Sequence, residues 1–232
     1  MIIIIPCHNE SDNIGQLVQE TKTLYPDVVV LVVDDGSTDN TAQIARDAGA
    51  NVISNPPNAE YRCGFQAGCQ YALRHGLSPV VFMNAGLSHN PRDIQYLVDN
   101  LNGSEVVAGT RFYIRTRGSR YNQSWWRSIL SGISHVVLHL LVGCKEVDYD
   151  SFRAFSEIGC AKAFSLSQRT NTPRCHGFNP QLAYLFHKEK IKLAYVPIVY
   201  RATTSSLRAR GVLWAAMCFA VFLIKEKLLL WR

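Results

Sequence analysis

Short apolar runs alternate with amphipathic segments over the first 110 residues of the chain. The runs are rich in β-branched residues, which is typical of strands buried on both faces of a parallel sheet. Between them, apolar positions recur at three- and four-residue spacing, which predicts helices. The expected strands cover 2–5, 28–33, 51–53, 80–83 and 105–108. Their alternation with helices predicts a doubly wound α/β fold with a parallel sheet and right-handed crossovers.

Turn and cap residues set the expected boundaries of these elements. Pro6 is expected to stop the first strand, because proline lacks the N–H that a central strand donates. Ser11 or Asp12 can cap the first helix, and Thr38 or Asp39 the second, since their oxygens accept hydrogen bonds from a helical first turn. No Gly-x-Gly-x-x-Gly turn follows the first strand. This argues against a dinucleotide-binding dehydrogenase.

Three loops are expected to line one crevice, because ligands of doubly wound sheets bind beyond the carboxyl ends of the strands. These loops cover 6–10, 34–38 and 84–89. The second loop opens with the adjacent carboxylates of Asp34 and Asp35. A carboxylate accepts hydrogen bonds, and ribose hydroxyls and base edges donate them. The pair therefore suits a nucleoside.

Composition restricts the class of partner. The chain has 232 residues, of which 47% are apolar and 18% charged, as in an ordinary globular domain. Its 24 Lys and Arg against 18 Asp and Glu give a net charge of +6, which favours an anionic partner: a nucleic acid, a phosphorylated small molecule or an acidic membrane surface. No nucleic-acid-binding motif or basic helix is found, so we expect no nucleic acid. The seven scattered cysteines lack a CxxC pair and predict reduced thiols in a cytosolic compartment.

The end of the chain differs from the rest. The segment 211–224 contains 14 residues without a charge, whereas a membrane span takes about 20. Basic residues flank it on both sides: Arg208, Arg210, Lys225 and Lys227. This pattern suits a helix lying in the interface of an anionic leaflet. The alternative is a helix packed on the core or on a second copy of the chain in a homodimer. We expect a domain over 1–207 and a membrane-associating helix over 208–232, on a peripheral protein at the cytoplasmic face of the plasma membrane.

An ordered series of motifs resembles a known family. It comprises Ile5-Pro6-Cys7-His8-Asn9-Glu10, Asp34-Asp35-Gly36-Ser37-Thr38-Asp39, Gly109-Thr110-Arg111, the segments 125–131 and 148–155, and Val196-Pro197-Ile198. Over about residues 1–207 the series resembles the inverting family 2 glycosyltransferases of GT-A fold, in particular their polyprenyl-phosphate, dolichol-phosphate mannosyltransferase-like branch. The resemblance implies a mostly parallel GT-A sheet flanked by helices. It also implies a hexosyltransferase that moves a sugar from a nucleotide-sugar donor to a polyprenyl phosphate or another glycan or lipid acceptor of the cell envelope.

The resemblance implies roles for single residues. Those that match the nucleotide-sugar pocket are Pro6, Asn9, Glu10, Asp34, Asp35, Asn84 and Gly86. Those that match the acceptor-phosphate site are Arg111, Arg127 and Ser131. Arginine suits phosphate through its forked donors. A sugar hydroxyl acceptor would also need a catalytic base, for which Asp148 and Asp150 are the candidates, whereas an ionised phosphate needs only cationic orientation.

The chain departs from the family at its metal-binding motif. After the fourth strand the family carries D-x-D, where Mg²⁺ or Mn²⁺ bridges the donor diphosphate; here the segment reads Asn84-Ala85-Gly86. Asn84 offers one neutral oxygen and Gly86 no side chain, whereas hard divalent cations prefer carboxylates.

Two interpretations of this change stay open. In the first, the leaving diphosphate is stabilised by arginines, or by a metal held with water through Asn84 and His89. The candidate arginines are Arg62, Arg111 and Arg201. In the second, the chain is a catalytically degenerate subunit that binds a nucleotide-sugar or a protein partner.

Overall fold

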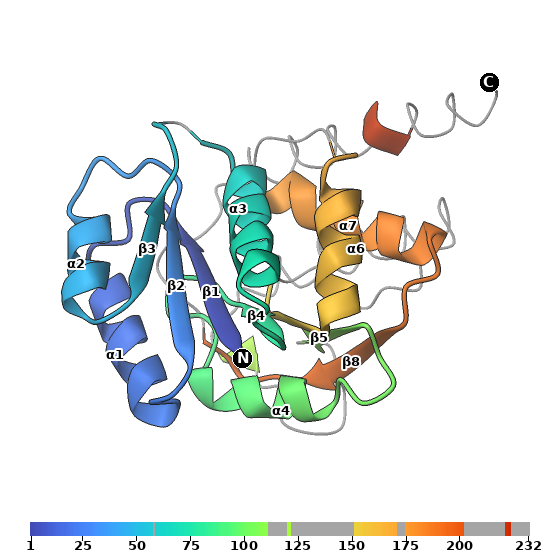
Figure 1. The fold of residues 1–232 in the computed structure, drawn as a ribbon, viewed down its shortest axis with the longest axis horizontal. Coiled ribbons are helices and arrows are strands. Elements are labelled where there is room, and N and C mark those ends of the chain that lie inside the picture. Colours follow the sequence, from blue (N-terminus) through green and yellow to red (C-terminus); the bar gives the residue numbers. More distant parts are fainter. Residues whose placement is uncertain (58, 111–119, 122–150, 171–174, 202–220, 224–232) are drawn as a thin grey trace.

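The protein is seen in a computed structural model that describes residues 1–57, 59–110, 120–121, 151–170, 175–201 and 221–223 (Figure 1). Its main sheet has seven strands in the order β3-β2-β1-β4-β7-β5-β8. Their bounds are β1 Ile2–Cys7, β2 Val29–Asp34, β3 Asn51–Ser54, β4 Val80–Phe82, β5 Val106–Thr110, β7 Arg153–Phe155 and β8 Leu193–Pro197. A separate sheet pairs β6 (Arg120–Tyr121) with β9 (Tyr200–Arg201).

The main sheet is mostly parallel, as expected. Only the pairs that β7 makes with β4 and β5 are antiparallel among the described strands of this sheet. This agrees with the predicted mostly parallel sheet, because β7 lies beyond the first 110 residues, for which parallel strands were predicted. Because β7 has three residues, it is too short to show a strand period in the sequence.

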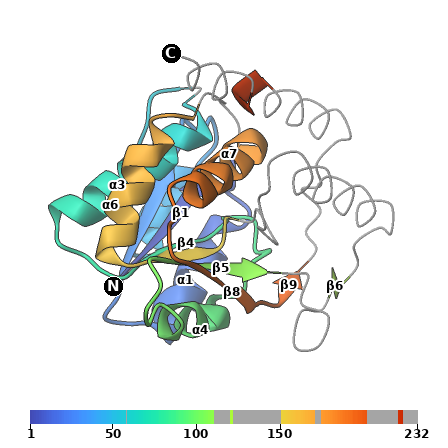
Figure 2. The same cartoon turned by 90° about the vertical axis from the view of Figure 1, so that its right-hand side faces the viewer.

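Helices cover both faces of the sheet (Figures 1 and 2). One face carries α3 (Tyr61–Arg74), α6 (Glu157–Ser167) and α7 (Cys175–Lys188). The other carries α1 (Ile14–Leu24), α2 (Thr41–Asp47) and α4 (Ile94–Asp99), which continues the short 3₁₀ helix η1 (Pro91–Asp93). This is the two-faced arrangement that the alternation of strands and helices predicts.

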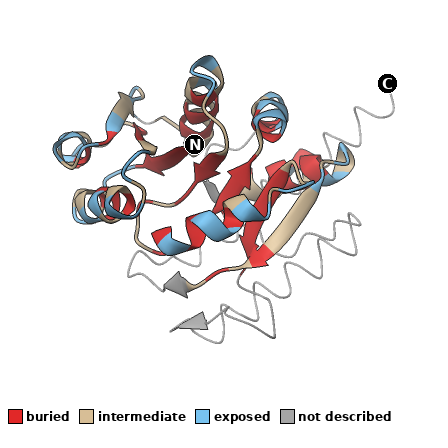
Figure 3. Cartoon of the chain, turned by 60° about the horizontal axis from the view of Figure 1, so that its bottom comes forward, coloured by how far each residue is buried: buried red, intermediate tan, exposed pale blue. Residues whose placement is uncertain are grey.

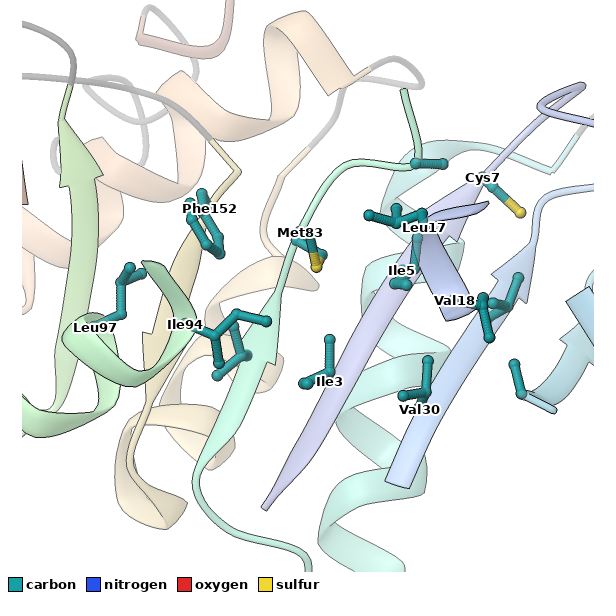
Figure 4. Packing of buried hydrophobic residues seen from close by; sticks show 14 of the residues in the cluster. Ile3, Ile5, Cys7, Leu17, Val18, Val30, Met83, Ile94, Leu97 and Phe152 are labelled. Atoms are coloured by element: carbon teal, nitrogen blue, oxygen red, sulfur yellow. The ribbon is translucent and has the colours of Figure 1, made fainter. Parts of the chain in front are cut away.

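The core lies on both sides of β1. Ile2 and Ile4 belong to the cluster under α3, and Ile3 and Ile5 to the cluster under α1. Figure 4 shows Ile3 and Ile5 on the α1 side, and the central strands of the sheet are red, meaning buried, in Figure 3, whereas β3 and most of β8 are not. Each of the four isoleucines is fully buried, which stabilises the fold by about 1.5–3 kcal/mol per side chain.

The first strand continues through Pro6 to Cys7, so the expected stop at Pro6 was wrong. Along a strand with a parallel neighbour on each side, the backbone N–H and C=O of one residue point to one neighbouring strand, and those of the next residue point to the other. Ile4 faces β4, because its carbonyl accepts a bond from the Met83 N–H (3.0 Å), and Pro6 therefore faces the same side. The pairing with β4 already ends at Ile4. The missing N–H of Pro6 consequently breaks no ladder bond.

The predicted cap of α1 was wrong, whereas before α2 the predicted Asp39 accepts the N–H of the first helical residue, Thr41, through its Oδ1 at 3.0 Å. Helix α1 has Asn13 at its N-cap position and α2 has Asn40, and neither makes a side-chain cap bond. Before α1, a turn closes on the carbonyl of Glu10, which accepts the Asn13 N–H (3.0 Å) and the Ile14 N–H (2.9 Å). The helix consequently starts after Ser11 and Asp12.

A single described turn of the C-terminal segment packs on the core. In 221–223 the Phe222 side chain is buried, and its ring meets that of Tyr184 on α7 edge to face at 5.8 Å. This turn therefore contacts α7, and the choice between a membrane-associating helix and a helix packed on protein stays a prediction. The rest of the predicted helix over 208–232 lies outside the described residues. Among the described helices, none has both the length and the apolar character needed to cross a bilayer.

Candidate functional site

The three loops predicted to act together follow adjacent strands. Strands β2, β1 and β4 are parallel neighbours, so their carboxyl ends meet at one edge of the sheet. The first two loops are joined directly. Asn9 adopts a left-handed backbone conformation (φ 54°), and its Oδ1 accepts a bond from the Thr38 N–H at 2.8 Å. The Asn9 N–H donates to Ser37 Oγ at 2.9 Å. Asn9 thereby fixes the two loops to each other.

Glu10 and Asp34 add further hydrogen bonds to these two loops. The Glu10 N–H donates to Thr41 Oγ1 (2.8 Å), and Glu10 Oε2 accepts from Asn13 Nδ2 (2.9 Å). Asp34 is buried, and its Oδ1 accepts from the N–H of Ser37 (3.0 Å) and from the Ser37 hydroxyl. The Asp34 carboxylate therefore closes the tight turn that presents Asp35.

Asp35 is buried at the carboxyl edge of the sheet, with 4% of its surface exposed. Asn55 Nδ2 donates to its Oδ1 at 2.8 Å. Among the described residues, none donates a hydrogen bond to Oδ2. The Asp35 carbonyl accepts from His8 Nδ1 at 3.1 Å, which orders the loop backbone. A buried acceptor atom without a donor is costly, so Oδ2 lacks a hydrogen bond that the described residues do not supply.

Burial raises the pKa of Asp35 from 3.8 to about 7. The hydrogen bond from Asn55 opposes this shift, and the neighbouring charge of Asp34 adds to it. The carboxyl of Asp35 is thus half ionised near neutral pH. It accepts hydrogen bonds on both oxygens above that pH and carries a proton below it.

This shift predicts a pH dependence of folding stability. The pKa of Asp35 is higher in the folded than in the unfolded chain, so the folded chain holds the proton more tightly. The contribution of the protonated Asp35 carboxyl to folding stability is therefore fully present below about pH 4 and is lost as the pH rises to about 7. We expect the free energy of unfolding of the wild type to fall by a few kcal/mol over this window relative to Asp35→Asn. Urea titrations of both proteins at several pH values measure the difference. Parallel profiles would contradict the assigned pKa.

Two supporting residues escaped the sequence analysis. Asn55 lies 20 residues from Asp35 and gives no local signal. Gly64, in the first turns of α3, lies against the Asp35 carboxylate: a Cβ there would come within 2.5 Å of Oδ2. Glycine inside a helical pattern costs about 1 kcal/mol relative to alanine, so its presence was the available signal.

The loop after β4 brings Asn84 and His89 together. The Asn84 N–H donates to His89 Nδ1 at 3.0 Å, and the Ser151 hydroxyl donates to Asn84 Oδ1. The His89 ring is buried and stacks on Phe152, with centroids 4.6 Å apart and planes 11° from parallel. Gly86 lies between the two residues in the same loop and adds no side chain. Ser151 and Phe152 come from the segment next to β7, which belongs to the family motif over 148–155, but the sequence assigned neither of them a role in the site.

Arg62 is engaged within the protein. Its Nη1 donates to the Thr170 carbonyl at 2.7 Å, and its Nη2 pairs with Glu60 at 3.1 Å. Arg62 thus ties the start of α3 to the segment after α6. The role of Arg62 as a cation for the diphosphate stays a prediction, and these two contacts are the ones it would share or exchange.

Several predicted site residues lie outside the described residues: Arg111, Arg127, Ser131, Asp148 and Asp150. Of Arg201, the structure describes only the backbone in β9. The roles assigned to these residues stay predictions. Among the described residues, no three His, Cys, Asp or Glu side chains gather as a metal ion would require.

Comparison with known proteins decides the family. The family model described as "Glycosyl transferase family 2" matches residues 2–178. The chain belongs to this family. The match covers all three loops at the carboxyl edge, and it confirms the resemblance on which the site residues were chosen.

Curated relatives of this family 2 chain include two enzymes named for polyprenyl phosphates. Polyprenol monophosphomannose synthase of Mycolicibacterium smegmatis is 31% identical over 149 residues, which are 61% of this chain and 56% of the relative. Undecaprenyl-phosphate mannosyltransferase of Micrococcus luteus is 26% identical over 164 residues, 66% of each protein. The matched region is thus little more than half the length of the first relative.

Solved structures confirm the GT-A fold of this family 2 chain. Glucosyl-3-phosphoglycerate synthase from Mycobacterium tuberculosis, in complex with Mn²⁺ and uridine-diphosphate-glucose, superposes with a TM-score of 0.70. The match covers 97% of this chain and 77% of that one, at 18% sequence identity. At this identity the likeness shows the fold alone.

Proposed function

We propose that the chain is an inverting glycosyltransferase that moves a sugar from a nucleotide-sugar donor to a polyprenyl phosphate. The observation that carries the proposal is Asp35 Oδ2, a buried acceptor without a donor among the described residues, at the carboxyl edge of the sheet. A ribose hydroxyl or a base N–H supplies the donor that this oxygen needs. Membership of the family and the names of the curated relatives support the sugar transfer and the acceptor.

The proposed reaction is one displacement at the anomeric carbon. A phosphate oxygen of the acceptor forms a bond to that carbon, and the bond to the donor diphosphate breaks from the opposite side. The nucleoside diphosphate leaves with the electron pair. Because a phosphate monoester is ionised at neutral pH, the attacking oxygen has no proton to lose and no general base is required. Under this proposal Asp148 and Asp150 have no role as a base.

The acceptor-phosphate site proposed for Arg111, Arg127 and Ser131 is supported by one feature of the described chain. Thr110, the residue before Arg111, is buried at the carboxyl end of β5, at the same sheet edge as Asp35. A polyprenyl chain is carried in a bilayer, so the proposal also places the protein peripherally at the cytoplasmic face of a membrane. The net charge of +6 supports attraction to an anionic surface.

Two measurements test the proposed function. A thermal-shift titration with UDP, GDP, CDP and dTDP and their sugars should show one base class that stabilises the wild type and not Asp35→Ala. Purified protein with that donor and a polyprenyl phosphate in vesicles should then release the nucleoside diphosphate and form a lipid-linked sugar. Stabilisation by no nucleotide would refute the proposal.

The segment Asn84-Ala85-Gly86 favours a second candidate function. A chain that has lost the acidic motif and the chemistry would be a nucleotide-sugar-binding or partner-binding subunit. Selective binding of a donor, without transfer or donor hydrolysis over a panel of acceptors, is the result that this candidate predicts.

A further inference from the structure

The loop after β4 occupies the place where the resemblance implies a divalent cation, and its residues do not fit one. A structural neighbour of this fold was solved with Mn²⁺ and uridine-diphosphate-glucose. Such hard cations take several oxygen ligands, carboxylates above all. In this chain the loop offers three positions to consider: Asn84, Gly86 and His89.

Asn84 offers at most one neutral oxygen. Its Oδ1 already accepts the hydroxyl proton of Ser151, which uses one of the two lone pairs of the amide oxygen. Gly86 has no side chain. Asn84 and Gly86 therefore replace the two carboxylates of the family motif by a single amide oxygen, which already has a partner within the protein.

His89 cannot act as a ligand in the observed arrangement. A backbone N–H can only donate, so the bond from the Asn84 N–H means that His89 Nδ1 carries no proton and that its lone pair is engaged. The neutral ring then carries its proton on Nε2, where no lone pair is left for a metal. Turning the ring would break the Asn84 bond and the stacking on Phe152.

These contacts position the loop after β4 against the segment that precedes β7. Ser151 and Phe152 lie just before and beside β7, whose pairing with β4 fixes them against Asn84 and His89. Among the described residues, the hydrogen bonds that join Ser151, Asn84 and His89 and the stacking of His89 on Phe152 contribute to holding the loop.

We infer that this chain binds its donor diphosphate without a divalent cation, and that the contacts of Ser151, Asn84, His89 and Phe152 maintain the loop in place of a metal. The inference rests on the proposed function, because it concerns the same donor. The negative charge of the diphosphate is then matched by basic side chains of the chain, which carries six more basic than acidic residues.

Isothermal titration calorimetry on the full chain tests this inference. The nucleoside diphosphates UDP, GDP, CDP and dTDP are titrated with excess EDTA and, separately, with excess Mn²⁺. We expect one of them to bind the wild type with affinities that agree within about twofold between the two conditions. Affinity at least about tenfold weaker in EDTA would overturn the inference and leave the proposed function intact. Absence of binding in both conditions would refute the proposed function itself.

A variant that restores the acidic motif sharpens the test. The double substitution Asn84→Asp and Gly86→Asp should gain a Mn²⁺-dependent increase in affinity of about tenfold or more. The matched control is Asn100→Asp with Asn102→Asp, two exposed positions with the same spacing and the same change of charge. It should show no response to Mn²⁺. An equal response in both variants would mean that added charge alone attracts Mn²⁺, and the comparison of the wild type in EDTA and Mn²⁺ would then decide.

Discussion

An Asp35→Asn variant is expected to bind the donor nucleotide about 10- to 150-fold more weakly than the wild type at pH 8. A hydrogen bond to a charged group contributes about 1.5–3 kcal/mol, which corresponds to that range. The variant keeps the shape of the side chain and can still meet Asn55, but it has lost one acceptor oxygen and the charge. Since the pKa of Asp35 is about 7, wild-type affinity should also fall between pH 8 and pH 6, whereas that of the variant should not. Calorimetric titrations at the two pH values measure both effects.

The matched control for this prediction is Asp12→Asn. Asp12 is an exposed carboxylate just after the Asn9 loop, so the same chemical change there should leave affinity unaltered. Gly64→Ala provides a second approach to the same carboxylate, because its Cβ would displace Asp35 Oδ2. It should weaken binding while Asp35 itself is retained. Unchanged affinity in both Asp35→Asn and Gly64→Ala would place the nucleotide elsewhere.

A Gly159→Ala variant is expected to lose roughly 2–4 kcal/mol of folding stability. A Cβ at this position in α6 would lie 1.9 Å from the backbone carbonyl oxygen of Glu105. That carbonyl also accepts the Ser156 N–H (3.0 Å), and Ser156 caps α6 through a bond from the Gly159 N–H (3.1 Å). Both the added Cβ and the Glu105 carbonyl belong to the backbone or are attached directly to it, so neither can rotate away. The start of α6 and the start of β5 must therefore move apart. Urea denaturation gives the free energy of unfolding.

Gly76→Ala separates this steric clash from the general cost of replacing a glycine. Gly76 has a φ of +59°, and no heavy atom lies within 4 Å of an added Cβ. Alanine there carries only the strain of the left-handed conformation, about 1–2 kcal/mol. If Gly159→Ala were no more destabilising than Gly76→Ala, this result would contradict the close approach of α6 to the Glu105 carbonyl.

The sequence predicted much of the fold because local patterns carry it. The β-branched run Ile2–Ile5 identifies a strand buried on both faces, and that strand lies at the centre of the core. The turn at Asp34 and Asp35 was likewise visible, since acidic residues directly after a strand in an alternating β-α pattern lie at its carboxyl edge. The family motifs selected Asp35, and the structure adds its burial and its partner Asn55.

The caps and short elements were harder to predict, because several local solutions compete there. Ser11, Asp12 and Asp39 are all acceptable N-caps by residue type. Before α1 the chain instead closes a turn on Glu10, whereas before α2 Asp39 Oδ1 accepts the Thr41 N–H at 3.0 Å, as predicted. These choices depend on the bonds between the first two loops, which join residues about 30 positions apart.

By itself, the sequence determined the α/β class, the position of the sheet edge that carries Asp34 and Asp35, and the loss of the acidic motif at Asn84 and Gly86. Only the tertiary structure decided which side chains are already engaged. Arg62 meets a carbonyl 108 residues away, and Asn84 meets a hydroxyl 67 residues away. Periodicity and turn chemistry act within a few neighbouring residues, whereas the partner of a polar side chain depends on which strands the sheet places side by side. Here the antiparallel insertion of β7 beside β4 brings Ser151 and Phe152 to the loop of Asn84 and His89.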